Sequence, residues 1–332
     1  MVIGLHKRAL LFLVWAALFP SLGVAQHLDV LVQVADGQVA IGGADYDSGT
    51  WTIGQRVFQR QLLSNFRAND PGFTGLATGN ALLESGVTGF PANHNIYFDL
   101  LPMRIGSVKS NLFFWNGTDL GGNGLGVDDV QFILPPAGVT WNIFDDGFNL
   151  FTAAATDTFV PGGLLQQTSS DTNPGDGINT GTLHGHLLMR VDDGDGNTQT
   201  TPPQGVYMAA LQVRAAGFET SDPFLFVHRT SSVSNVVRDL ATEWADLNYD
   251  SLFGLPGDFD QDGDVDGRDF LAWQRGESPL SWSPDDLAEW QGSFGTGPLL
   301  ASFSGIPEPT SLSLAGGSLV LGLLWRTRGS RI

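Results

Sequence analysis

The sequence predicts a mainly β domain, of the β-sandwich or jelly-roll-like kind, followed by a small α-helical module. Glycine (43 residues) and aspartate (29) are abundant, whereas glutamate (six) and lysine (two) are scarce, and this composition favours strands and turns. Short β-branched and aromatic runs separated by Gly, Pro and Asp-Gly fill most of the chain. An Asp-rich loop and two segments of helical periodicity follow them. We therefore expect two folded regions, residues 26–250 and residues 257–297.

The charge and the absence of cysteine exclude several classes of protein. The formal net charge is -19, so the chain lacks the basic footprint that nucleic acid requires. With no cysteine, the chain forms no disulfides, thiolate zinc sites, iron–sulfur clusters or cysteine nucleophiles. An acidic surface of this kind attracts cations.

Residues 1–25 have the pattern of a secretory signal peptide. Lys7 and Arg8 precede the apolar run Ala9–Phe19, and a small residue stands at Ala25. The run is shorter than the roughly 20 residues that a permanent membrane anchor requires. We expect cleavage near Ala25 and export of the mature chain.

The region 26–250 is predicted to consist of short strands with two helices. The helix candidates are Gln55–Asn65 and Val236–Leu247, and Asp192–Asn197 is predicted to be a hairpin turn. Trp51, Trp115 and several Phe residues are suited to filling the core. The predicted strands are Val30–Val34, Val39–Ile41, Ile96–Leu101, Asn111–Trp115, Val130–Leu134, Leu187–Val191, Val206–Val213 and Phe224–Val227.

Four polar residues of this region form a candidate transition-metal site. Side chains alternate along a strand, so His184 and His186 would place two imidazoles on one face, and His27 and Asp29 form a second alternating pair. Imidazole suits Zn²⁺ or Cu²⁺. The alternative is that these residues are ordinary polar side chains without a metal.

The same residues resemble motifs of bacterial surface-anchored proteins. His27 opens the segment His-Leu-Asp-Val-Leu, and His184-x-His186 is followed by Gly205-Val206-Tyr207, as in those families. Leu187 and Leu188 stand where those families often carry an aromatic residue. The resemblance implies handling of a transition metal at the cell surface.

An Asp-rich loop follows the β region and has the ligand spacing of a calcium-binding EF-hand. Numbered from Asp258, carboxylates stand at loop positions 1, 3, 5, 9 and 12, with Gly263 at position 6 for the sharp turn and a backbone carbonyl at position 7. Position 12 is an Asp, where the usual EF-hand has Glu. The predicted calcium residues are Asp258, Asp260, Asp262, Asp264, Asp266 and Asp269.

Residues 257–297 resemble a dockerin module, in which two loop-helix units follow each other. The spacing Asp269 to Trp273 recurs at Asp286 to Trp290, but the second loop offers almost no carboxylates, so we expect one calcium ion. In dockerins the helices bind a cohesin. Gly267 and Arg268 occupy the place of the polar recognition pair, which argues against a cohesin-like partner and leaves a calcium-stabilised spacer as the alternative.

Residues 306–332 resemble the PEP-CTERM sorting signal of bacterial envelope proteins. Pro307-Glu308-Pro309 precedes the apolar stretch Ser311–Trp325, and Arg326, Arg328 and Arg331 end the chain. The resemblance implies processing by a membrane-bound exosortase-type peptidase, and delivery to the cell surface, outer envelope or extracellular matrix.

Three classes of function are consistent with these features. The first is a non-catalytic, surface-displayed binding or structural protein, with an envelope or extracellular polysaccharide as one candidate ligand. The second is capture of zinc at the cell surface through the histidine site. The third is a secreted carbohydrate-active protein or other hydrolase, although no nucleophile elbow, phosphate loop or dinucleotide fingerprint is present. We therefore predict that the protein is not an enzyme.

Overall fold

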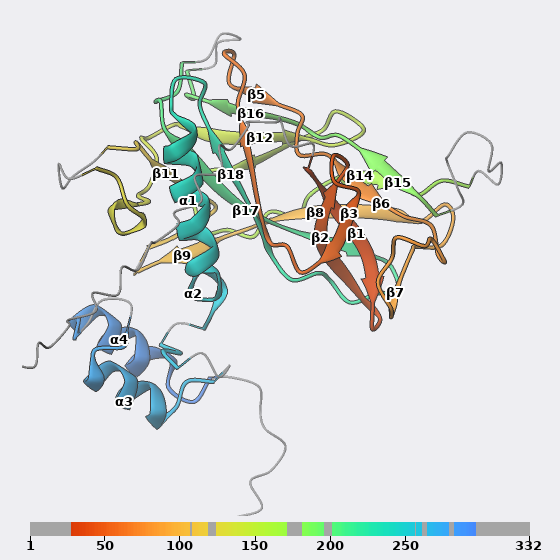
Figure 1. Cartoon of the computed structure of the whole chain (residues 1–332). Helices are drawn as coiled ribbons and strands as arrows, with labels where there is room; N and C mark the ends of the chain where they lie inside the picture. The colour runs from red at the N-terminus through yellow and green to blue at the C-terminus, as the bar shows by residue number, and fades with distance from the viewer. Residues whose placement is uncertain are drawn as a thin grey trace, which may run out of the picture. The chain divides into compact units, whose positions relative to one another are not determined.

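The computed structural model (Figure 1) describes residues 28–106, 108–118, 124–170, 181–195, 201–255, 257–260, 264–278 and 282–296. The chain divides into two compact units. One comprises Met1–Met103 and Lys109–Leu247, and the other comprises Arg104–Val108 and Asn248–Ile332. The predicted fold class, a mainly β domain followed by a small helical part, is confirmed.

The first sheet of the β unit carries the candidate metal residues. Its strands are ordered β15-β6-β1-β2-β3, and β7 pairs with β1. The short strand β6 lies between β1 and β15, parallel to β1 and antiparallel to β15. The strands are β1 (Leu28–Ala35), β2 (Gln38–Asp45), β3 (Thr50–Ile53), β6 (Phe73–Gly75), β7 (Val87–Thr88) and β15 (Leu183–Gly185).

The second sheet has the order β14-β8-β17-β18-β4, and β11 pairs with β17. Eight of the ten residues of β17 and all six of β18 are buried, so these two strands lie at the centre of the second sheet. The strands are β4 (Val57–Gln61), β8 (Asn95–Leu101), β11 (Leu112–Trp115), β14 (Leu164–Gln167), β17 (Val206–Ala215) and β18 (Phe224–Arg229).

A third sheet completes the β unit, with the order β13-β12-β16-β5. One hydrophobic core joins the three sheets. Phe226 of the second sheet lies 6.0 Å from Phe73 of the first and 6.2 Å from Trp141 of the third, measured between ring centroids. The strands of the third sheet are β5 (Arg67–Ala68), β12 (Thr140–Phe144), β13 (Leu150–Ala153) and β16 (Leu188–Asp192), and β9 (Met103–Ile105) and β10 (Val108–Ser110) form a separate ribbon.

The helices are few and short. In the β unit, the 3₁₀-helix η1 spans Val127–Asp129 and α1 spans Asn235–Leu247, which confirms the predicted helix Val236–Leu247. Helix α1 packs against β4 and β18 through its apolar face. The second unit contains α2 (Tyr249–Phe253), α3 (Gly267–Arg275) and α4 (Pro284–Ser293).

Seven of the eight predicted strands coincide with observed ones, and three local predictions are wrong. Gln55–Asn65 is not a helix, because Val57–Gln61 forms the edge strand β4, parallel to β18. Val130–Leu134 is not a strand and makes only a bridge at Ile133, since the prolines that follow it cannot extend a ladder. β16 and β17, the described strands on either side of Asp192–Asn197, belong to different sheets, so the segment does not join two paired strands, and its residues Gly196 and Asn197 lie outside the described residues.

Candidate metal centre

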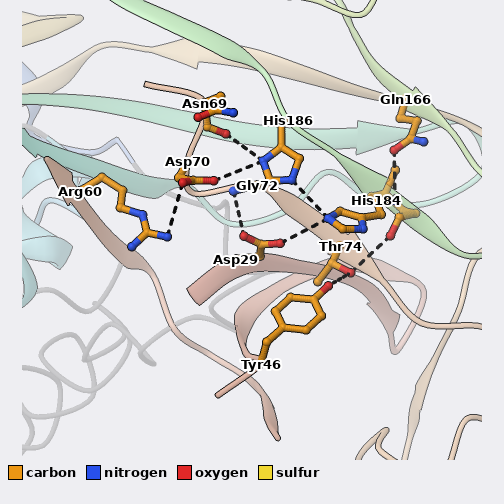
Figure 2. A network of polar contacts seen from close by, with 11 residues as sticks. Asp29, Tyr46, Arg60, Asn69, Asp70, Gly72, Thr74, Gln166, His184 and His186 are labelled. Carbon is orange, nitrogen blue, oxygen red and sulfur yellow. Dashed lines mark hydrogen bonds and ion pairs between the residues drawn. The ribbon is translucent and has the colours of Figure 1, made fainter. Parts of the chain in front are cut away.

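The structure brings Asp29, His184 and His186 together at one edge of the first sheet (Figure 2). β6 positions them, because β1 pairs with one side of β6 and β15 with the other, in registers that align Val30 with Phe73 and His184 with Thr74. Residues from distant parts of the chain thus meet across a single short strand. His27, the fourth predicted residue, lies outside the described residues.

The three side chains present their ligand atoms to one another. The Nε2 atoms of His184 and His186 are 3.2 Å apart, and Asp29 Oδ2 is 3.9 Å from His184 Nε2. Zn–N bonds of roughly 2.0–2.1 Å place two ligand nitrogens of a tetrahedral site about 3.3 Å apart, so the imidazole pair has the spacing of one edge of such a site. The Asp29 side chain is fully buried, whereas 56% of the His184 side chain is exposed to solvent. An ion held here would reach solvent on the histidine side.

The hydrogen bonds of His186 determine which ring nitrogen is available to a metal. His186 Nδ1 lies 2.9 Å from the backbone carbonyl of Asn69, and a carbonyl oxygen only accepts hydrogen bonds. Nδ1 therefore carries the proton in the neutral ring, and Nε2 has the free lone pair. A metal ion at this site would therefore be bound by Nε2 of His186.

Asp29 is held in place by a backbone donor. The N–H of Gly72 donates to Asp29 Oδ1 at 3.0 Å. A Cβ atom on Gly72 would lie 2.6 Å from Cε1 of His186 and 3.1 Å from Asp29 Oδ1, so any larger residue would displace the His186 ring and crowd the Asp29 carboxylate. Glycine is required here because the side chains of His186 and Asp29 lie close to its Cα atom, and not because of its backbone conformation.

Tyr46 covers His184 without being suited to bind the metal itself. Its ring stacks on the imidazole at 6.3 Å between centroids, and its hydroxyl donates to Thr74 Oγ1 at 2.9 Å. Burial, together with the negative charge of Asp29, raises the pKa of Tyr46, and the hydrogen bond to Thr74 only partly opposes this. The phenol is therefore neutral at physiological pH and leaves two imidazoles and one carboxylate as the donor set.

That donor set fits a borderline transition-metal ion. Two neutral imidazoles and a carboxylate are typical ligands of catalytic or exchangeable zinc, in which one coordination position remains open. Of the residues that form this centre, the sequence pattern indicated Asp29, His184 and His186. It did not indicate Tyr46 or Gly72, because neither belongs to a local metal-binding motif.

The Asp-rich loop of the second unit gathers five of its six predicted carboxylates. Asp258, Asp260 and Asp269 form one group, and Asp264 and Asp266 form another with the same Asp269. Asp262 lies outside the described residues. A donor set made only of oxygen atoms suits a hard cation such as Ca²⁺.

Asp269 organises this loop from within. Its side chain is fully buried, Oδ1 accepts hydrogen bonds from the backbone N–H groups of Phe259 and Asp260, and Oδ2 accepts one from Asp266. Asp266 in turn caps α3 by accepting from the N–H of Arg268. Three of the roughly four acceptor sites of the Asp269 carboxylate are thus used by the backbone, which leaves little capacity for a bidentate contact.

The second half of the module braces the loop. Trp290 of α4 donates from Nε1 to the carbonyl of Asp266 at 2.7 Å, and its ring lies 4.8 Å from that of Phe270. The backbone of Val265, at loop position 8, exchanges hydrogen bonds with Gly295 and Thr296 just after α4. These contacts hold the described part of the loop against α4 and the residues that follow it.

Comparison with known proteins returns no matching family model, no matching curated protein and no matching solved structure. Within the described part of the chain, no helix is long and apolar enough to cross a membrane. The predicted signal peptide (1–25) and sorting segment (306–332) lie outside that part. Fold and geometry together define a mainly β protein with a histidine–aspartate candidate metal centre and an acidic loop-helix module.

Proposed function

We propose that this chain is an exported, surface-displayed, non-catalytic protein that binds a zinc-class metal ion through Asp29, His184 and His186. One observation carries the proposal: two imidazoles turn their Nε2 atoms toward each other at 3.2 Å beside a fully buried carboxylate. The Gly72 N–H donates one hydrogen bond to this carboxylate, and the two imidazoles bring two further ligand atoms to the same place. With a divalent cation, the carboxylate charge is compensated.

The display role rests on the sequence of the two ends. The expected signal peptide, the PEP-CTERM-like segment and the exosortase-type peptidase it implies would deliver the β unit to the cell surface or matrix. The partial exposure of His184 and His186 is consistent with an ion exchanged with the medium. A polysaccharide ligand stays a prediction from the sequence.

Calorimetric titration of the purified, tag-free chain with zinc tests the proposal. We expect one zinc ion per β unit, and saturation should raise the melting temperature, because a ligand that binds only the folded state stabilises it. Calcium added first should not compete, since hard oxygen ligands and imidazoles select different ions. A chain that takes up no zinc at micromolar concentration would contradict the proposal.

The calcium module gives a separate prediction. Asp260→Ala removes the ligand at loop position 3, and we expect calcium affinity to fall by roughly tenfold or more, because affinity depends on the number of charged ligands. Calorimetry measures the affinity, and the melting temperature of the β unit should stay unchanged. Glu277→Ala, which removes an exposed carboxylate paired with Arg275, is the matched control and should bind calcium normally. Equal affinities in the two variants would show that Asp260 is not a ligand.

A further inference from the structure

The segment Asn69–Gly72 contacts two of the three ligand residues of the metal centre. It connects β5 to β6, and none of its residues belongs to the predicted ligand set. The carbonyl of Asn69 accepts from His186, and the N–H of Gly72 donates to Asp29. The segment therefore holds one ligand on each side of the candidate ion.

Asp70 adds a charge to this arrangement. Its Oδ1 lies 3.3 Å from His186 Nδ1, the same nitrogen that contacts Asn69 (Figure 2). A carboxylate beside the protonated ring nitrogen makes the opposite nitrogen a stronger donor to a metal, and it stabilises the positive charge that the ring shares when an ion binds. Asp70 thus acts on the metal through His186 rather than by direct contact.

Arg60 orients the Asp70 carboxylate. Its guanidinium Nη2 lies 3.6 Å from Asp70 Oδ2, so one oxygen faces Arg60 and the other faces the imidazole. The Asp70 side chain is 39% exposed and that of Arg60 22%, and a partly exposed ion pair at this distance contributes little to folding stability. The specific orientation therefore matters more for the imidazole than for the fold.

We infer that Asp70, oriented by Arg60, is a positioning residue of the metal centre and raises its affinity for zinc through His186. The inference rests on the proposed function. A purely structural Asp70 would serve only its ion pair with Arg60. In that case its neutralisation would leave metal affinity unchanged.

The test compares zinc affinity in wild type and Asp70→Asn, measured by competition with a chelating indicator. Loss of a carboxylate behind a ligating histidine lowers metal affinity by about 10- to 100-fold, and we expect a loss in this range. The intensity of the visible absorption of bound Co²⁺, which reports the number of ligand atoms, should not change, because the atoms that touch the ion remain the same. Asp70→Glu, which restores the charge, should recover most of the affinity.

The matched control is Asp47→Asn, which removes an equal charge from the exposed turn next to Tyr46 and should bind zinc like wild type. Two results would overturn the inference: an Asp70→Asn affinity equal to wild type, or a changed intensity of the Co²⁺ absorption, which would make Asp70 a ligand. Both differ from failure of the proposed function, in which wild type itself binds no zinc.

Discussion

Replacing His184 and His186 together with alanine is expected to abolish specific zinc binding and to leave the fold intact. Both imidazoles present Nε2 to the same point, and removal of both leaves a single carboxylate, so affinity should fall by well over the roughly 100-fold that loss of an outer-shell group can cause. The side chains of His184 and His186 are 56% and 33% exposed, so truncating them creates little cavity. Calorimetry and thermal melting with and without zinc measure both effects.

The matched control for this variant is His94→Ala. His94 is also a histidine of the β unit, but its ring lies against Phe90 and Phe218. Its loss should leave zinc affinity and the zinc-dependent rise in melting temperature unchanged. Zinc affinity of the double variant equal to that of wild type would refute the metal centre directly.

The second large effect concerns His228, a buried histidine that is not one of the predicted metal ligands. It is fully buried on β18, its ring lies 4.8 Å from Trp141 and 5.5 Å from Phe226, and neither ring nitrogen has a hydrogen-bond partner among the described residues. Burial, with a smaller contribution from the positive charge of Arg60, lowers the pKa of His228 to about 3. The folded protein therefore keeps this ring neutral over most of the acidic range.

Stability should consequently decrease as the pH falls below the ordinary histidine pKa. The unfolded chain takes up a proton near pH 6.5, whereas the folded chain does so only near pH 3, so unfolding is favoured progressively within that window. The slope is about 1.4 kcal/mol per pH unit, which gives roughly 3 kcal/mol between pH 6.5 and pH 4. Above pH 6.5 the His228 ring is neutral in both the folded and the unfolded chain, and its contribution to the pH dependence disappears.

His228→Phe should remove this pH dependence. Urea unfolding of wild type and variant at pH 7 and pH 4, with a chelator to remove metal, measures the difference in free energy of unfolding. At pH 7 the free energy of unfolding of the variant should equal or exceed that of wild type, because the phenyl ring has no buried nitrogens without hydrogen-bond partners. At pH 4 the difference in favour of the variant should be larger by about 3 kcal/mol. His228→Gln separates the effect of burying a polar group from the effect of protonating the ring. This variant should be less stable than His228→Phe at both pH values, but its stability should change with pH in the same way. Parallel curves for wild type and His228→Phe would contradict this account.

The success of the strand predictions depended on how completely each strand is buried. β17 and β18 begin with continuous apolar runs, 206–211 and 224–227, because both faces of these segments are buried, and such runs are visible in the sequence. β4 was mistaken for a helix because its polar residues follow no strand alternation. Its strand conformation depends on parallel pairing with β18 and on the cover of α1, where Thr242 donates to Gln59.

The candidate metal centre was only partly visible in the sequence. The strand period of two placed His184 and His186 on one face, and their Nε2 atoms do lie together. The roles of Asn69, Asp70 and Gly72 could not be predicted from the sequence. They depend on the backbone carbonyl of the first, the carboxylate of the second and the missing side chain of the third, and each of these matters only because the fold places it next to His186.

The sequence by itself determined those features of the protein that are set by residues close together in the chain. These features are the mainly β class, helix α1, the His-x-His geometry and the carboxylate spacing of the acidic loop, because backbone periodicity is set within one or two turns or strands. Only the tertiary structure decided that Asp29, a candidate from the sequence, lies beside the two histidines, that Asp70 contacts His186, and that His228 is buried beside Trp141. These contacts depend on which strands pair across long separations, and pairing is selected by burial of the whole core rather than by any local pattern.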